Sequence, residues 1–82
     1  MDFWPEFITI KPGCFERVCE ILTEIFNCGP TDRGYGRERW RIIAKDINWY
    51  SPAEHQAKVA IWTIDFEEEK IHDYLRKQGL VA

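Results

Sequence analysis

Residues 33–62 read RGYGRERWRIIAKDINWYSPAEHQAKVAIW, and the secondary structure of this stretch decides the fold class. It contains three of the four tryptophans and the densest group of basic residues in the chain. If it forms two helices joined by a turn, the protein is all-α. If it forms two strands of a hairpin, the protein is α+β.

The first half of this stretch has the spacing of an amphipathic helix. Apolar side chains recur at i, i+3, i+4 and i+7, namely at Trp40, Ile43, Ala44 and Ile47. As a strand, the same residues would leave charged or amide groups on both faces, whereas a half-buried strand should alternate cleanly. The pattern therefore predicts a helix over 37–48.

The second half begins with a helix-start signature, Ser51-Pro52-Ala53-Glu54. Serine is a good N-cap, proline suits the first helical position, and the glutamate can complete a capping box. These residues predict a helix over 52–63. The run VAIWTI at 59–64 opposes this interpretation, because its β-branched and aromatic residues favour a strand.

The flanking segments predict two more helices and an arm. An apolar stripe with a following Gly-Pro pair predicts a helix over 14–27, and an acidic first turn with a terminal glycine predicts another over 66–78. FITIK lies between two prolines and predicts an extended N-terminal arm. The expected fold is an all-α, compact four-helix domain with helices at about 14–27, 37–48, 52–63 and 66–78. The alternative is α+β in a β-α-β-β-α order, with strands near 6–10, 39–49 and 57–64.

Length and composition predict one small globular domain spanning residues 1–82. The longest apolar run is far shorter than the roughly 20 residues that a membrane-spanning helix needs. The N-terminal residues lack the features of a signal peptide. Three cysteines are an odd number without close ligand pairs, so we expect reduced thiols in the cytoplasm and no bound metal.

Charge is unevenly distributed along the chain, whose net charge is −3. Between Arg33 and Lys58 basic residues outnumber acidic ones by six to three, while acidic residues dominate on both sides. Such asymmetry bears on the choice of partner rather than on the fold. The pattern contains no catalytic motif and no phosphate-binding loop, so we expect neither an enzyme nor a cofactor.

The sequence instead predicts a small binding module that acts through a basic, aromatic-rich surface. Trp, Tyr and Arg dominate interface hot spots, and a helical interpretation leaves Trp49 and Trp62 off the apolar faces of their helices. The expected partner is a larger protein, which the module would regulate or inhibit, or a second copy of the chain. The candidate binding residues are Tyr35, Arg37, Arg39, Arg41, Trp49, Tyr50, Lys58 and Trp62.

The alternative function is nucleic-acid binding through a helix-turn-helix-like unit at 37–62. The sequence pI of about 5.3 opposes it, because nucleic-acid-binding domains are usually basic. The arrangement of the basic residues should separate the two functions. One continuous stripe of unpaired cations favours nucleic acid, whereas pairing with acidic helix ends favours a protein partner.

Overall fold

The structure is a computed structural model that describes residues 5–31, 39–45, 56–65 and 67–82. In chain order the elements are β1 (Glu6–Thr9), α1 (Phe15–Phe26), β2 (Arg39–Ala44), β3 (Lys58–Trp62) and α2 (Glu68–Lys77). The described residues therefore form an α+β fold, and the all-α prediction is wrong. The alternative β-α-β-β-α order agrees with the structure.

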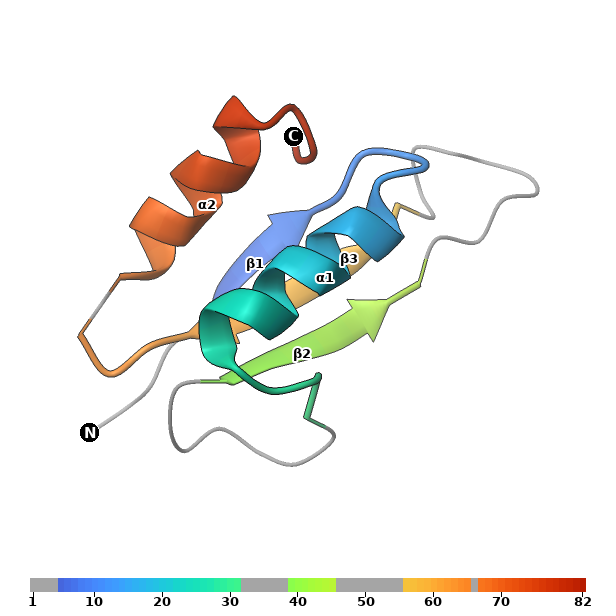
Figure 1. Cartoon of the computed structure of the whole chain (residues 1–82). Helices are drawn as coiled ribbons and strands as arrows, with labels where there is room; N and C mark the ends of the chain where they lie inside the picture. The colour runs from blue at the N-terminus through green and yellow to red at the C-terminus, as the bar shows by residue number, and fades with distance from the viewer. Residues whose placement is uncertain (1–4, 32–38, 46–55, 66) are drawn as a thin grey trace.

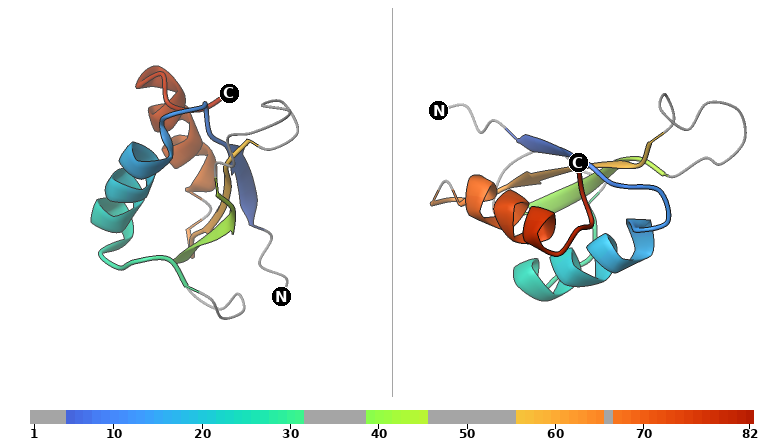
Figure 2. Two further views of the ribbon diagram at one scale, coloured as in Figure 1. Left: turned by 90° about the vertical axis from the view of Figure 1, so that its right-hand side faces the viewer. Right: turned by 90° about the horizontal axis from the view of Figure 1, so that it is seen from above.

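The three strands form one antiparallel sheet in the order β1-β3-β2. Because β1 and β2 both run antiparallel to β3, they are parallel to each other with β3 inserted between them. This is a split β-α-β arrangement, in which α1 connects two strands that are not neighbours. Both helices pack on the same face of the sheet, as Figures 1 and 2 show.

The predicted helix at 37–48 is wrong because residues 39–44 form strand β2. Trp40 and Ile42 face the helices in this strand, opposite Ile61 and Val59 of β3. A β-bulge between Ile42 and Ala44 then shifts the register. A bulge inserts one extra residue into a strand, so it breaks the period-two alternation and hides the strand signal.

The predicted helix at 52–63 is wrong because residues 58–62 form the central strand β3. Val59 and Ile61 belong to the core on the helix side, while Ala60 and Trp62 point to the other face. All four side chains are fully buried. A strand buried on both faces appears as a continuous apolar run without alternation. The Ser51–Glu54 signature lies outside the described residues.

The first and last predicted helices agree with the structure. Gly79 ends α2 with a φ of 74°, a left-handed conformation that glycine adopts without steric cost. The amides of Gly79 and Leu80 donate to the carbonyls of Arg76 and Leu75, which is the hydrogen-bond pattern of a Schellman motif. At the other end, Thr63 Oγ1 accepts from the Glu67 amide while the Thr63 amide donates to Glu68 Oε1. These bonds join the end of β3 to the start of α2.

The core lies between the sheet and the two helices. Val18, Ile21 and Leu22 of α1 and Leu75 of α2 pack against the inward-facing strand residues. The indole Nε1 of Trp40 donates to the Cys28 carbonyl at 2.9 Å, which ties β2 to the end of α1. The predicted N-terminal arm corresponds to β1 in its described part.

Both outer strands have their free edges partly covered. The C-terminal Val81 makes a single antiparallel bridge with Ile10, next to β1. On the other side, the Thr31 amide donates to the Trp40 carbonyl at 2.9 Å. Covered edges limit further strand pairing.

We predict that Trp62→Ala lowers the free energy of unfolding by about 3–5 kcal/mol, because the side chain is fully buried. Tyr74→Ala is the matched control, since Tyr74 is 46 % exposed and should change stability by about 0.5 kcal/mol or less. Urea unfolding measures both. If Trp62→Ala were as stable as the unmodified protein, the conclusion that the Trp62 side chain is buried would be wrong. If Trp62→Ala does not fold, Trp62→Phe should show a smaller loss.

Candidate binding surface

The sheet has one face without a helix, which we call the open sheet face (Figure 2). Strand alternation places on it seven side chains, namely Phe7 and Thr9 of β1, Arg39 and Arg41 of β2, and Lys58, Ala60 and Trp62 of β3. Residues from three separate segments of the chain thus share one surface.

The open sheet face is cationic. Arg39 lies opposite Trp62 in the register, Arg41 opposite Ala60, and Lys58 opposite Ala44. Within the three strands Glu6 is the one acidic residue, and it points to the helix side. None of the three cations forms an ion pair with a described acidic residue. Within the described part of the chain, the positive charge of this face is therefore not compensated by an ion pair.

Phe7 adds an apolar group to the same surface. Its side chain is 55 % exposed, and its cross-strand neighbour is the small Ala60, with Arg41 on the far side of Ala60. The ring and the guanidinium group thus lie in one row across the sheet. A large exposed aromatic side chain beside unpaired cations is typical of a contact surface.

The structure brings four of the eight predicted binding residues onto this face. Arg39, Arg41 and Lys58 are exposed or half-buried there, whereas Trp62 lies on the same face with its side chain fully buried. Trp62 therefore offers no exposed indole, contrary to the helical interpretation. The other four predicted residues, Tyr35, Arg37, Trp49 and Tyr50, lie outside the described residues. The helix-turn-helix-like unit at 37–62 is excluded because 39–44 and 58–62 are strands.

Sequence reasoning missed Phe7 as a surface residue. The signal was present in the alternation of EFITI, where Ile8 and Ile10 are core residues and Phe7 and Thr9 point the other way. The all-α interpretation treated this segment as an extended arm and assigned it no binding residue. The alternative with a strand near 6–10 places Phe7 on the face opposite Ile8 and Ile10.

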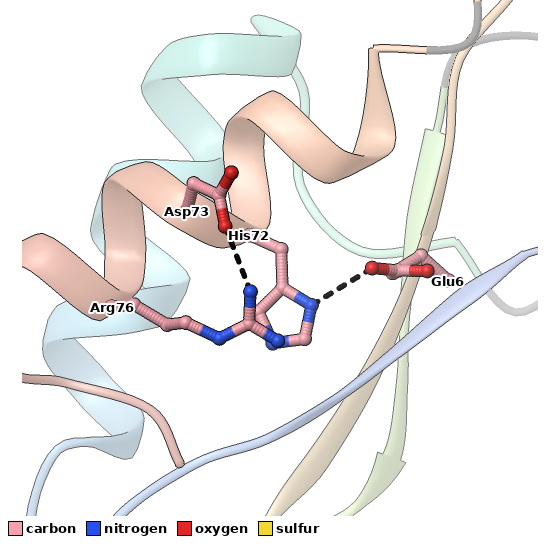
Figure 3. Close-up of polar contacts among 4 residues, drawn as sticks. All are labelled: Glu6, His72, Asp73 and Arg76. Carbon is pink, nitrogen blue, oxygen red and sulfur yellow. Dashed lines mark hydrogen bonds and ion pairs between the residues drawn. The ribbon is translucent and has the colours of Figure 1, made fainter.

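A buried polar pair lies on the helix side of the sheet. His72 of α2 donates from Nδ1 to Glu6 Oε2 of β1 at 2.9 Å, and its side chain is 9 % exposed (Figure 3). The neighbouring Arg76–Asp73 ion pair, at 2.8 Å, is confined to the surface of α2. His72 thus fastens α2 to the first strand.

The His72–Glu6 pair resembles two members of a catalytic triad in chemistry, but a nucleophile is missing from the described contacts. Nε2 of His72 is buried and has no hydrogen-bond partner among the described residues. Cys14, Cys19 and Cys28 are free thiols. Burial raises the pKa of the Cys19 thiol, nearby Lys45 lowers it and Glu16 raises it, with a net rise. A raised pKa lowers the thiolate fraction, so Cys19 is a poor nucleophile at neutral pH.

Across the described parts of the chain, the structure contains no group of three or more His, Cys, Asp or Glu side chains positioned to hold a metal ion. Neither described helix has the length and apolar character that crossing a bilayer requires. No protein-family model, curated protein or solved structure matches the chain. The open sheet face and the His72–Glu6 pair are therefore the features from which a function can be proposed.

We predict that Glu6→Ala and His72→Ala are energetically coupled. Each single change should cost about 1–3 kcal/mol, because it leaves a buried or half-buried polar partner without its hydrogen bond. The double variant should lose less than the sum, with a coupling energy of about 0.5–3 kcal/mol by urea unfolding. Asp73→Ala with Arg76→Ala is the matched control, an exposed pair whose coupling should stay below about 1 kcal/mol. Equal coupling in the two cycles would contradict a structural role for His72.

Proposed function

We propose that the protein is a non-catalytic binding module that docks an acidic surface of a partner protein on its open sheet face. The observation that supports this function is that Arg39, Arg41 and Lys58 share one sheet face with the exposed Phe7, with no described acidic residue paired to the cations. A module of this kind would act as a regulator or inhibitor of the larger protein. Its three free thiols suit a reducing compartment, so we place its action in the cytoplasm.

The electrostatics favour a partner whose acidic residues are concentrated in one patch. The protein carries a net charge of −3, but its strands contribute three basic residues and only Glu6 on the acidic side, which faces inward. Complementary charge steers the encounter and fixes the orientation of docking more than it adds affinity. Phe7 would supply the apolar contact, since burying its exposed area contributes favourable free energy.

Single-stranded nucleic acid is the second candidate partner. Domains that bind single strands on a sheet face combine exposed aromatic rings, on which bases stack, with cations that contact phosphates. The lack of an ion pair between Arg39, Arg41 or Lys58 and any described acidic residue favours this candidate. The acidic net charge weighs against it, as does the fact that Phe7 is the one aromatic side chain that the described residues expose on the face. An acidic protein surface therefore remains the first proposal.

The test compares two variants that remove the same charge from different surfaces. One variant carries Arg39→Gln, Arg41→Gln and Lys58→Gln, and the control carries Lys11→Gln, Lys70→Gln and Lys77→Gln on exposed positions elsewhere. The probes are poly-L-glutamate and a single-stranded oligothymidylate, and the readout is fluorescence anisotropy.

We predict that the face variant binds poly-L-glutamate about tenfold more weakly than the unmodified protein. Each exposed charge contact contributes from a few tenths of a kcal/mol to about 1 kcal/mol. Three such contacts together approach the ~1.4 kcal/mol that corresponds to a tenfold change in Kd. The control variant should bind almost as well as the unmodified protein. Tighter binding to the oligothymidylate than to poly-L-glutamate, with a steep loss of affinity as the salt concentration rises, would indicate nucleic acid rather than an acidic protein as the partner. Equal binding by both variants would show that the open sheet face is not the binding surface.

A further inference from the structure

The outward surface of α1 has the opposite charge to the open sheet face. It carries Glu16, Glu20 and Glu24, all exposed and spaced four residues apart. Helical periodicity places these three residues away from Val18, Ile21 and Leu22, which face the core. Together with Phe15, Cys19 and Thr23 they line a shallow hollow of about 650 Å³. We call these six residues the acidic α1 face.

Among the described residues, only part of the negative charge on the acidic α1 face is compensated, since Lys45 lies near Glu16 and Cys19 without forming an ion pair. Arg17 contacts Glu20 at 3.0 Å, but this pair is exposed on both sides and contributes little. Glu16 and Glu24 form no ion pair with a described residue. Like charges four residues apart destabilise a helix by a few tenths of a kcal/mol per pair. A cationic partner on this face would relieve that repulsion.

The charges on the two faces repeat at nearly the same distance. Arg39, Arg41 and Lys58 occupy three successive rows of the open sheet face, at the β3 positions 62, 60 and 58. Rows two residues apart are separated by about 6.6 Å along a strand. Carboxylates four residues apart on a helix are separated by about 6.0 Å along the axis. Along the strand direction the spacings over three positions differ by about 1 Å. Lys58 also lies one strand, about 4.8 Å, to the side of Arg39 and Arg41, an offset that its long side chain can span.

Each face also places an apolar strip beside its charged strip. On α1, Phe15 and Cys19 are half-buried and precede Glu16 and Glu20 by one residue, so they lie on the adjacent side of the helix. On the sheet, Phe7 lies two strands away from Arg41 in the same row. When the charges meet, the exposed ring of Phe7 can therefore lie toward the hollow beside Phe15 and Cys19.

We infer that the acidic surface recognised by the open sheet face is the acidic α1 face of a second copy of this chain. This inference rests on the proposed function and names its partner. Contact between two open sheet faces would bring like charges together, which opposes a symmetric face-to-face dimer. The two surfaces lie on opposite sides of the molecule, because α1 covers the sheet face that the cations do not occupy (Figures 1 and 2). One copy can therefore contact two others, and the assembly grows head to tail into chains or rings.

The test uses two variants that each disable one face. The sheet-face variant carries Arg39→Glu and Arg41→Glu. The helix-face variant carries Glu16→Lys and Glu24→Lys, which leaves the Arg17–Glu20 pair intact and places one new lysine near each end of α1. A lysine at position 16 interacts unfavourably with the helix dipole, whereas a lysine at position 24 interacts favourably, so the two effects on helix stability should oppose each other. A control variant carries Asp65→Lys and Glu69→Lys, on exposed positions away from both faces. Circular dichroism confirms that each variant is folded, and sedimentation velocity over a concentration series gives the mass.

The unmodified protein and the control variant should increase in mass with concentration, whereas each face variant alone should stay monomeric. An equimolar mixture of the two face variants should again increase in mass with concentration. The intact sheet face of one variant meets the intact α1 face of the other, and the two charge-reversed faces are also complementary to each other. A mixture that stays monomeric while the unmodified protein associates would overturn the head-to-tail contact.

A protein that is monomeric at all concentrations would also overturn the inference. If the variant with Arg39→Gln, Arg41→Gln and Lys58→Gln still binds poly-L-glutamate more weakly than the unmodified protein, the proposed function survives and the partner is a different acidic protein. If that binding is unaffected as well, the proposed function fails too. The two failures are therefore distinguishable.

Discussion

The central position of β3 is the constraint on which the rest of the structure depends. This strand pairs with β1 on one side and with β2 on the other, and four of its five side chains are fully buried. Its inward residues Val59 and Ile61 contribute to the core beneath the helices, while Ala60 and Trp62 fill the middle and one end of the opposite face. A strand buried in this way is apolar at its buried positions. The charge on the outer face comes from Arg39 and Arg41 of β2 and from Lys58 at the start of β3.

Strand pairing with β3 also produces the binding surface. Arg39 and Arg41 share a face because successive side chains in a strand point to opposite sides, and pairing places Lys58 in the next row. Among the described residues, α1 carries Glu16, Glu20 and Glu24 against Arg17 alone, whereas acidic and basic residues balance on α2. The described part of the molecule is thus polarised between the cations of the open sheet face and the carboxylates of α1. This polarity underlies both the proposed binding function and the proposed head-to-tail contact.

The sequence predicted the two helices because each contains its own periodic apolar stripe and its own end signals. It failed for β2 and β3 for two different physical reasons. In β2 the bulge at Ile42–Ala44 interrupts the alternation that identifies a strand. In β3 burial on both faces removes the alternation altogether, and a short apolar run of this type cannot be distinguished from a buried helix by periodicity.

Part of the candidate surface was predicted, but from an interpretation that assumed the wrong secondary structure. Arg39, Arg41 and Lys58 were selected because they cluster in the sequence, and the strands bring them together although the expected helices do not exist. Trp62 was selected as an exposed indole, but burial in the sheet takes it out of contact with solvent. Phe7 follows from the alternation of residues 6–10, in which Ile8 and Ile10 are core residues, once this segment is interpreted as a strand. Surface residues on a sheet depend on register, which is a property of distant segments.

Nuclear Overhauser contacts between β2 and β3 test the central claim most directly. The Trp40 carbonyl accepts from Thr31, so it points away from β3, and Trp40 with Ile61 forms a non-hydrogen-bonded pair. In such a pair the two Cα atoms approach to about 4.5 Å, which predicts a strong contact between the α-protons of Trp40 and Ile61. Its absence, together with sequential amide–amide contacts through residues 39–44, would show a helix in this segment. The open sheet face would then not exist.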